Sequence, residues 1–308
     1  MNDQLVLTDA PAEADWPVTN CYIDAWLQIL RAWDLDPIAA LGVTLRQDYE
    51  GDQFTFFKFL HEDLERLYGI QAGELAIYTT VEQHAQEQVR RGNLVLVEVD
   101  GYYLPDTRTT SYRQQHTKTT IGVDRIDPPQ RRLSYFHNAG YYHLDGEDYA
   151  GVFHTHVLPP YVEVVKRRWP PLRGDALTGA TVGLLRQHLR RRPEQNPVAT
   201  YRADFTRHVE WLMQNPHLFH EYAFNNFRQL GANWQLLGQH LQWLQARGVG
   251  QFAEQIDAAA TMSATAKAMQ FKVARIASRR RFDACESMFD TLEQNYGLVM
   301  QSLQERFG

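Results

Sequence analysis

The chain has 308 residues, of which 44% are hydrophobic and 22% charged, and its formal net charge at pH 7 is −6. This is the composition of a soluble globular protein, and the length is enough for two domains. The acidic balance argues against a general nucleic-acid-binding protein. The two cysteines, Cys21 and Cys285, are too few for a disulfide-rich scaffold or a four-cysteine zinc site.

Targeting features are also missing from the sequence. Its first 16 residues are acidic and lack the basic and apolar regions of a signal peptide. No apolar run approaches the ~18 residues that a membrane-spanning helix needs. We therefore expect a cytoplasmic protein that does not associate with membranes.

The first half of the chain mixes helical and strand-like patterns. Apolar residues at helical spacing, apolar runs, and proline and glycine punctuation predict its elements. These are an extended segment at 1–18, helices at 21–33, 37–42, 61–68 and 80–91, and strands at 43–46, 94–99, 118–123 and 132–136. A helix followed by an antiparallel sheet predicts an α+β fold.

Four prolines and a glycine between residues 159 and 175 mark a change of composition. We place the domain boundary in this stretch, which gives domains at 1–165 and 166–308. The pattern after it is helical almost to the end, and an up-and-down bundle is the simplest arrangement. The helices are expected at 175–192, 198–214, 216–231, 232–247, 250–280 and 282–307.

Cys21 lies where a loop becomes an amphipathic helix. Thr19 or Asn20 can cap the first turn. One face of that helix carries Ile23, Trp26, Leu27 and Leu30. Unpaired N–H groups and the positive end of the helix dipole favour a thiolate at such a position and can hold an oxyanion. The alternative is a buried structural cysteine, which is a common environment for this residue type.

A cysteine nucleophile needs a base and a group that orients the base. Because the chain has twelve histidines, only position can single one out. His116 begins a predicted strand, and Asn138 follows the strand that should pair with it. A hairpin brings the start of one strand beside the end of the next, so we expect these two side chains to meet. Cysteine, histidine and asparagine then follow in the order found in papain-like enzymes.

Other histidines provide weaker candidates. His137 is next to Asn138, but adjacent strand residues point to opposite faces, so only one of them can face the cleft. His154 and His156 resemble a metal-binding pair on a strand, yet a third ligand at suitable spacing is missing. We therefore expect no metal.

Six sequence blocks resemble an uncharacterised bacterial family found beside ligases that load amino acids onto carrier proteins. They are NCYIDAW, QDYEGDQFTFFKF, ELAIY, LVLVEVDGYYLPDT, SYRQQHTKTTIGVDRID and YFHNAGYYHLDGEDY, and they cover most of residues 19–153. That family is similar to the papain-like acyltransferases of butirosin-type aminoglycoside biosynthesis. The resemblance implies a papain-like fold in the first domain, with Cys21 as nucleophile, His116 as base and Asn138 as the orienting residue.

The resemblance also implies the substrates. The donor would be an acyl or aminoacyl thioester on the phosphopantetheine arm of an acidic carrier protein, and the acceptor an amine or similar small molecule, with no bound cofactor. Papain-like folds place a glutamine before the cysteine to build the oxyanion hole, but residues 17–20 are Pro-Val-Thr-Asn. Asn20, Gln47 or Gln53 would have to take that role.

Polar residues near the expected cleft are candidates for substrate binding. One group lies in the polar loop after residue 46, and the other surrounds His116. They are Asp48, Glu50, Tyr103, Asp106, Arg108, Tyr112 and Lys118. Five residues just ahead of His116 are candidates either for orienting its ring or for binding the acceptor: Asp100, Tyr103, Asp106, Arg108 and Tyr112. Loop capping and turn formation explain such residues equally well.

Eight Lys or Arg and one acid lie between residues 166 and 192. Such a basic surface would suit an acidic carrier protein. The arginines assigned to it are Arg167, Arg168, Arg190, Arg191 and Arg192. Solvated helix ends, whose arginines complement the helix dipole, are the alternative.

The favoured function is therefore an acyl or aminoacyl transferase that forms a thioester on Cys21. A thioesterase or peptidase with the same three residues is the alternative enzyme. A non-catalytic adaptor, which binds a partner through its helical half, is the alternative from another class.

Overall fold

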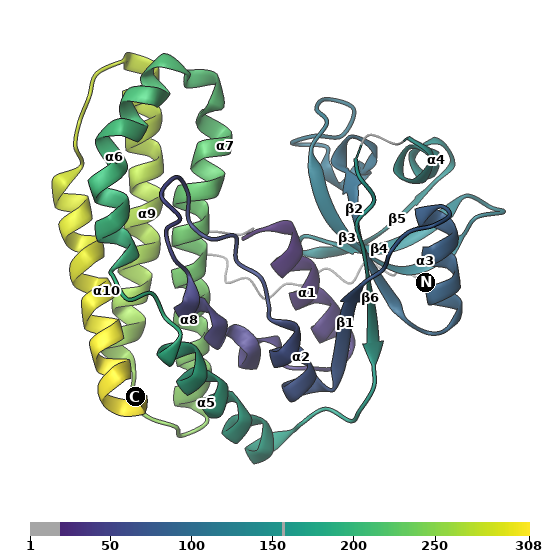
Figure 1. Ribbon diagram of the computed structural model, residues 1–308, viewed down its shortest axis with the longest axis horizontal. Coiled ribbons are helices and arrows are strands. Elements are labelled where there is room, and N and C mark those ends of the chain that lie inside the picture. The colour runs from purple at the N-terminus through teal and green to yellow at the C-terminus, as the bar shows by residue number, and fades with distance from the viewer. Residues whose placement is uncertain (1–18, 156–157) are drawn as a thin grey trace. The chain divides into compact units, whose positions relative to one another are not determined.

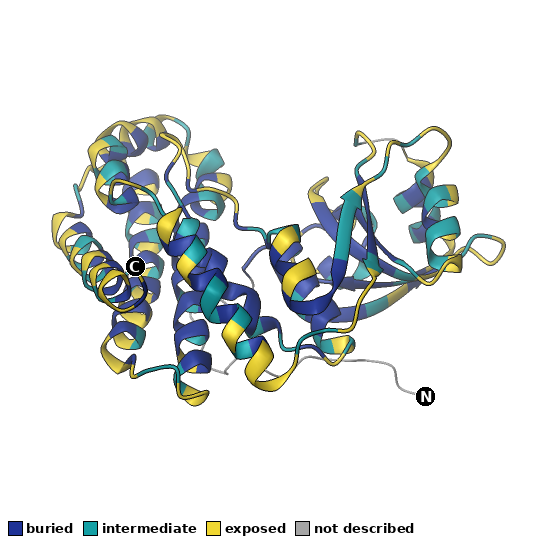
Figure 2. Cartoon of the chain, turned by 60° about the horizontal axis from the view of Figure 1, so that its bottom comes forward, coloured by how far each residue is buried: buried dark blue, intermediate teal, exposed yellow. Residues whose placement is uncertain are grey.

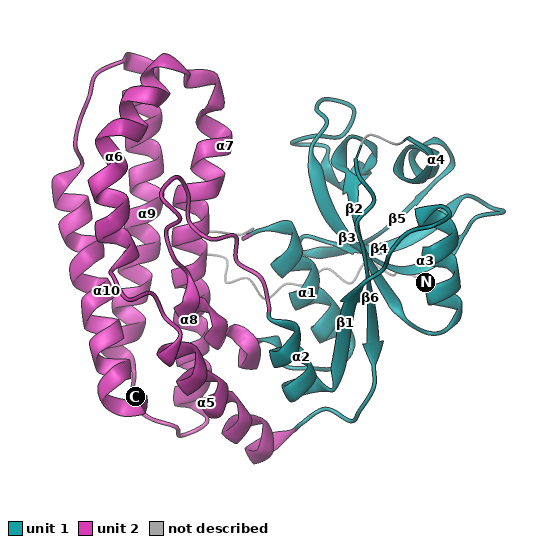
Figure 3. Ribbon diagram, viewed as in Figure 1, with its two compact units in different colours: residues 1–9, 20–37, 60–172 teal, residues 10–19, 38–59, 173–308 magenta. Residues whose placement is uncertain are grey.

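The computed structural model describes residues 19–155 and 158–308. These residues form two compact units, shown in Figure 3. Of the described residues, the first unit holds 20–37 and 60–172, and the second holds 19, 38–59 and 173–308. The chain passes from the first unit to the second at 37–38, returns at 59–60, and passes to the second again at 172–173, inside the proline-rich stretch.

The first unit is built on a six-stranded sheet in which every neighbouring pair is antiparallel (Figure 1). The strand order is β1-β6-β2-β3-β4-β5. Its strands are β1 (Ile70–Glu74), β2 (Leu94–Asp100), β3 (Lys118–Asp127), β4 (Arg132–His137), β5 (Gly140–Asp145) and β6 (Val162–Arg167). The predicted antiparallel sheet and α+β class are confirmed.

Four α-helices accompany this sheet. They are α1 (Cys21–Ala32), α2 (His61–Tyr68), α3 (Val81–Arg90) and α4 (Gly146–His154). All lie at predicted positions except α4, which the sequence analysis did not identify. Thr80 caps α3 by accepting a hydrogen bond from Gln83 N.

The two faces of the sheet carry different helices. On one face, α1 approaches closely enough that a Cβ on Gly122 would lie 2.9 Å from Ile29 Cδ1 and 3.5 Å from Leu94 and Leu96. The opposite face packs Val95, Val97 and Val99 of β2 together with Ala85 of α3 and Tyr149 and Phe153 of α4. Because alternate strand residues point to opposite faces, β2 is buried on both sides.

The strand expected at 43–46 is wrong. These residues end a 3₁₀ helix, η1 (Pro37–Arg46), in which Thr44 Oγ1 donates to Leu41 O. Asn233 Nδ2 of the second unit donates to Thr44 O at 3.0 Å. A four-residue apolar run does not distinguish a strand from a buried helical turn, and the packing partners decide.

The segment 38–59 belongs with the helices of the second unit, although it lies in the first half of the sequence. Gln47 Nε2 donates to Gln229 O, and Phe57 N donates to Gln229 Oε1. Phe54 N donates to Asn225 O. Among the described residues of segment 38–59, the only β-bridge joins Tyr49 and Phe54.

The second unit is helical, as predicted. Its elements after η1 are α5 (Gly174–Arg190), α6 (Pro197–Gln214), η4 (Pro216–Leu218), α7 (Phe219–Ala223), η5 (Phe224–Arg228), α8 (Gln229–Ala246), α9 (Ala253–Arg279) and α10 (Glu286–Phe307). The break predicted at residue 231 is wrong, because Gly231 is buried inside α8 and the helical run from 216 to 246 is continuous, with a π-helical turn at η5. Most helices bury one side only (Figure 2).

Within residues 19–155 and 158–308, no helix is both long and apolar enough to cross a membrane.

Candidate functional site

Cys21 is the first residue of α1, as the helical spacing predicts. Asn20 precedes it in an extended conformation, and its Oδ1 accepts a hydrogen bond from Ile23 N at 2.9 Å. The Cys21 side chain is half-buried, whereas Ile23 and Trp26 are fully buried. The thiol therefore lies on a helix start that is anchored by packing on its apolar side.

The residue after Cys21 fixes this helix start to the sheet. Tyr22 Oη donates to Glu163 Oε2 on β6 at 3.0 Å and lies 3.3 Å from His61 Nε2. Tyr161 Oη donates to Glu163 Oε1 at 2.6 Å. Burial, and next the Glu163 carboxylate, raise the pKa of Tyr22 well above its ordinary value. Tyr22 therefore remains a hydrogen-bond donor, and no sequence pattern distinguished this contact in advance.

His116 is held by a carboxylate from the end of β2. Its Nδ1 lies 2.5 Å from Asp100 Oδ2, and its ring stacks on Tyr102 with centroids 4.5 Å apart and planes at 15°. Asp100 Oδ1 accepts hydrogen bonds from Tyr102 N and Thr117 N. The Asp100 side chain is 6% exposed and that of His116 is 57% exposed. A fixed, buried acceptor thus orients an imidazole whose other edge is open to solvent.

The α1 helix and this pair belong to the same face of the sheet. Leu94 and Leu96 face Ile29 of α1, and Asp100 follows them on β2 at even spacing. Even spacing on a strand means a common face. Glu163 pairs directly with Leu96, so the acceptor of the Tyr22 hydrogen bond also lies on this face. Asp100, which binds His116, and α1, which begins at Cys21, therefore belong to one side of the sheet.

Asn138 lies in a hairpin turn rather than beside His116. It follows β4 and precedes β5, where His137 pairs with Gly140, and its φ is +45°. Its Nδ2 lies 3.4 Å from His137 Nδ1. Among the described residues, no hydrogen bond joins Asn138 to His116.

The strand register explains this difference. The ladder between β3 and β4 reaches only to Gly122 and Phe136, whereas β3 begins four residues earlier at Lys118, which pairs with Asp100. The start of β3 therefore lies beside β2. Asp100, at the end of β2, is the residue that contacts His116, whereas the predicted hairpin had placed Asn138 there. Asp100, directly after the apolar run at 94–99, was one of the residues that the sequence offered for orienting His116.

A second histidine–aspartate pair lies on the other face. His137 Nδ1 is 2.5 Å from Asp106 Oδ2, and its Nε2 is 2.7 Å from Thr119 Oγ1. Tyr135 Oη donates to Asp106 Oδ1, and burial followed by the Asp106 charge raises the Tyr135 pKa. His137 is 1% exposed. Both ring nitrogens are used in the interior, which is the arrangement of a structural histidine.

The loop residues proposed for oxyanion or substrate binding all belong to the second unit. Gln47 Nε2 is bound to Gln229 O. Gln53 Nε2 donates to the neighbouring Asp52, Asp48 accepts from Tyr49 N, and Glu50 accepts from Thr55 Oγ1. Their contacts are those of a self-supporting loop.

The candidates around His116 are held within the first unit. Tyr103 lies against Gly151, and Asp106 binds His137. Tyr112 Oη donates to Asp148 at 3.0 Å, and Lys118 Nζ donates to Glu98 at 2.6 Å. The carbonyl of Arg108 accepts from Gln114 Nε2.

Arg113 organises this loop, although the sequence analysis did not single it out. Its guanidinium lies 5.4 to 5.6 Å from the ring centroids of Tyr102, Tyr103 and Tyr112. It also pairs with Asp148 at 2.5 Å. Three aromatic rings and a carboxylate around one cation give a defined structure to the segment that ends at His116.

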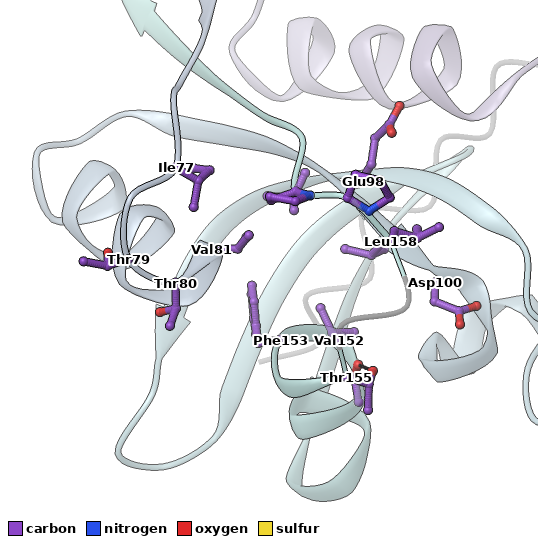
Figure 4. A pocket seen from close by; sticks show the side chains of 15 residues that line it. Ile77, Thr79, Thr80, Val81, Glu98, Asp100, Val152, Phe153, Thr155 and Leu158 are labelled. Atoms are coloured by element: carbon purple, nitrogen blue, oxygen red, sulfur yellow. Dashed lines mark hydrogen bonds between the residues drawn. The ribbon is translucent and has the colours of Figure 1, made fainter.

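A small pocket of about 110 Å³ borders the end of β2 (Figure 4). Asp100 and Glu98 contribute to its lining together with Ile77, Thr80 and Phe153. Such a volume holds only a few non-hydrogen atoms. The carboxylate that orients His116 thus also borders a cavity suited to a small group.

The basic residues divide between the two units. In the first unit, the Arg167 guanidinium lies 5.1 Å from the Trp33 ring, and Arg168 Nε donates to Gln71. In the second unit, Arg190, Arg191 and Arg192 end α5, where Arg192 Nη1 donates to Leu189 O. Helix capping thus accounts for Arg192.

The remaining thiol, Cys285, and the remaining candidate metal ligand, His154, do not form a functional site. Cys285 is buried, and burial raises the pKa of its thiol to about 11. His154 ends α4 and lies 3.2 Å from Glu82, while His156 is outside the described residues. In the described ranges, no group of three or more His, Cys, Asp or Glu side chains is arranged to hold a metal ion.

Comparison with protein families matches nearly the whole chain. Residues 8–167 match the DUF1839 N-terminal domain, and residues 174–305 match the DUF1839 C-terminal domain. The chain belongs to the DUF1839 family. A search of curated proteins found no match. In this DUF1839 protein, the N-terminal match contains Cys21 and both histidine–aspartate pairs, and the C-terminal match contains α5 to α9 and all but the last two residues of α10.

Proposed function

We propose that this protein is a cysteine-dependent acyl or aminoacyl transferase with a papain-like first unit. Cys21 is the nucleophile, His116 the base, and Asp100 the residue that orients the base. The observation that carries the proposal is the short Nδ1 contact of a solvent-exposed His116 with a buried Asp100, on the sheet face that α1 covers. In this proposal, Asp100 and not Asn138 is the third catalytic residue, after Cys21 and His116.

The orientation of His116 suits proton transfer. With Nδ1–H bound to Asp100, the neutral ring presents Nε2 as an acceptor toward solvent. Stacking on Tyr102 fixes the ring plane. A base must be positioned before its pKa matters, and two independent contacts position this one.

The reaction proceeds in two balanced steps. His116 takes the Cys21 proton, the thiolate attacks the thioester carbonyl, and a new S–C bond forms as the bond to the carrier sulfur breaks. The imidazolium returns its proton to the departing thiolate. An amine then attacks the acyl-enzyme, an N–C bond forms as the Cys21 S–C bond breaks, and the amine proton passes through His116 to sulfur.

The α1 start supports both steps physically. The N-terminal end of a helix carries partial positive charge and N–H donors, which favour a thiolate and a tetrahedral oxyanion. The anchor of Tyr22 on Glu163 holds this helix end against the sheet. Thioester exchange is nearly balanced energetically, so positioning and water exclusion are the main contributions required of the protein.

The donor in this proposal is a phosphopantetheine thioester on an acidic carrier protein in the cytoplasm, and the acceptor is a small amine. The sequence resemblance supports this choice. Arg167 and Arg168 of the first unit are the residues proposed to contact the carrier.

Intact-mass analysis after mixing with aminoacylated carrier protein tests the proposal. We expect a mass increase equal to the acyl group on the wild-type protein and on Cys285→Ser, but not on Cys21→Ala. Release of free acid at one rate with and without added amines would instead identify a hydrolase. If the wild-type protein stays unmodified and Cys21→Ala binds its partner as well as the wild type does, the protein is a non-catalytic adaptor.

A further inference from the structure

The second unit contains a pocket of about 640 Å³ that is separate from the Cys21 site. It lies between the end of α6, the run from η4 to η5, and the loop at residues 52–53. Its volume falls in the range of small-molecule sites. Trp211, Leu218 and Tyr222 provide apolar wall, and Asp52, Glu221 and Asn226 provide polar groups.

Asn226 is placed at this pocket by the π-helical turn η5. Such turns are rare and often occur at functional sites. Asn226 is 1% exposed, and its Nδ2 donates to Tyr222 O at 3.2 Å. Its Oδ1 has no hydrogen-bond partner among the described residues. Exchanging the two amide atoms would set two oxygens against each other, so the orphan group is an acceptor, which a donor from a ligand or a water would satisfy.

A rigid aromatic network stands behind the pocket wall. The two ring nitrogens of His208 contact Tyr49 Oη at 3.2 Å and Tyr222 Oη at 3.1 Å. Tyr222 Oη also lies 2.6 Å from Tyr201 Oη. Burial, and next the charge of Arg207, lower the pKa of His208, so this imidazole is neutral at pH 7. The network therefore adds shape but no positive charge to the pocket.

The charged groups of the lining favour a cation. Asp52 and Glu221 are exposed carboxylates at its edge. The guanidinium of Arg207 also borders the pocket, but it is bound to Asp204 at 2.9 Å and to Gly51 O at 3.1 Å. The Trp211 side chain is 44% exposed, and a tryptophan face attracts cations more strongly than other aromatic rings.

We propose that this pocket binds a small primary amine with an aromatic body. The ligand ring lies against Trp211 and Leu218, and the ammonium donates to Asn226 Oδ1 and to the carboxylates of Glu221 and Asp52. An ammonium supplies three donors to a pocket that presents acceptors. This site does not depend on the function proposed for Cys21.

Isothermal titration calorimetry with three probes of one shape tests the proposal. The probes are phenethylamine, 2-phenylethanol as the neutral analogue, and 3-phenylpropanoate as the anion. We expect phenethylamine to bind with an affinity of about millimolar, typical of a ligand of this size. We expect 2-phenylethanol to bind about tenfold more weakly, and 3-phenylpropanoate not to bind.

Variants locate the binding. Glu221→Gln and Trp211→Leu change solvent-facing side chains, and thermal unfolding verifies that each protein remains folded. We expect binding to weaken about threefold in Glu221→Gln and about fivefold in Trp211→Leu. Glu254→Gln removes an exposed carboxylate outside this pocket and is expected to leave affinity unchanged.

Equal affinity for the amine and the alcohol, or unchanged binding in both pocket variants, would overturn the proposal. So would the absence of binding to the folded wild-type protein. Cys21→Ala is expected to bind phenethylamine like the wild type. Failure of the amine site and failure of the transferase function are therefore distinguishable.

Discussion

The two histidine–aspartate pairs of the first unit have the same local geometry and opposite surroundings. Both have an Nδ1 to carboxylate distance of 2.5 Å, and both carboxylates come from the stretch that begins at the end of β2. His116 is 57% exposed and His137 is 1% exposed. In His137 the second ring nitrogen is used by Thr119. A carboxylate partner thus orients an imidazole, but solvent access and a second nitrogen open to solvent decide whether the imidazole can exchange protons with a substrate.

The largest expected effect follows from removing the exposed imidazole. We expect His116→Gln to slow acylation of Cys21 by about 10³-fold, because the proposed general base is lost. Its free energy of unfolding should change little, since the ring is mostly solvated. Rapid-quench mixing followed by mass spectrometry measures the acylation rate. An unchanged rate would remove His116 from the mechanism.

The second-largest effect is expected from changing Asp100, the carboxylate that binds His116. Asp100→Asn keeps the side-chain shape but changes which ring nitrogen of His116 carries the proton. We expect acylation to slow by about 10²-fold, less than for loss of the ring itself. Glu98→Gln is the matched control, because Glu98 neighbours Asp100 on β2 and binds Lys118 instead of histidine. Equal effects of the two changes would indicate a general charge effect.

A change in the buried pair of His137 and Asp106 should lower stability and leave the acylation rate unchanged. His137→Leu leaves the Asp106 carboxylate in the interior with Tyr135 as its remaining partner. We expect the free energy of unfolding to fall by about 1–3 kcal/mol, the cost of an unsatisfied buried polar group. Urea denaturation measures the loss. The acylation rate per folded molecule should remain that of the wild type, and a large decrease would contradict the structural role.

A third histidine, His208 of the second unit, pairs with tyrosines instead of a carboxylate. Burial, and next the charge of Arg207, lower its pKa below the ordinary value of 6.5. The unfolded chain therefore takes up the proton first as pH falls, and stability present above about pH 6.5 is lost below it. We expect the urea midpoint of the wild type to fall more between about pH 7.5 and 5.5 than that of His208→Gln. Parallel pH profiles would contradict this assignment.

The smallest expected effect distinguishes the two possible roles of Asn138. Its φ of +45° is a conformation that glycine adopts without strain. We expect Asn138→Gly to change the free energy of unfolding by less than about 0.5 kcal/mol and to leave acylation unchanged. If Asn138 orients His116 during the reaction, the acylation rate will fall instead.

Local signals in the sequence were sufficient for most elements and for the environment of Cys21. The helix start depends on a capping residue, Asn20, and on apolar residues three and four positions apart, all within two turns. The α2 bounds, the strands β2, β3 and β4 and the long helices of the second unit follow from similar short-range patterns, whereas β1, β5 and β6 were not predicted. Local rules succeed here because each depends on neighbours along the chain.

Only the tertiary structure decided which polar groups meet. Asp100 rather than Asn138 orients His116, because β3 begins beside β2 and reaches β4 only from Gly122 onward. Residues 38–59 join the helices of the second unit through contacts with residues more than 150 positions away. Strand register and burial depend on packing between distant segments, which residue spacing does not specify. The sequence by itself therefore determined where the thiol lies on its helix. The folded chain placed His116 in the loop before β3, not on a strand, and determined which carboxylate each histidine binds.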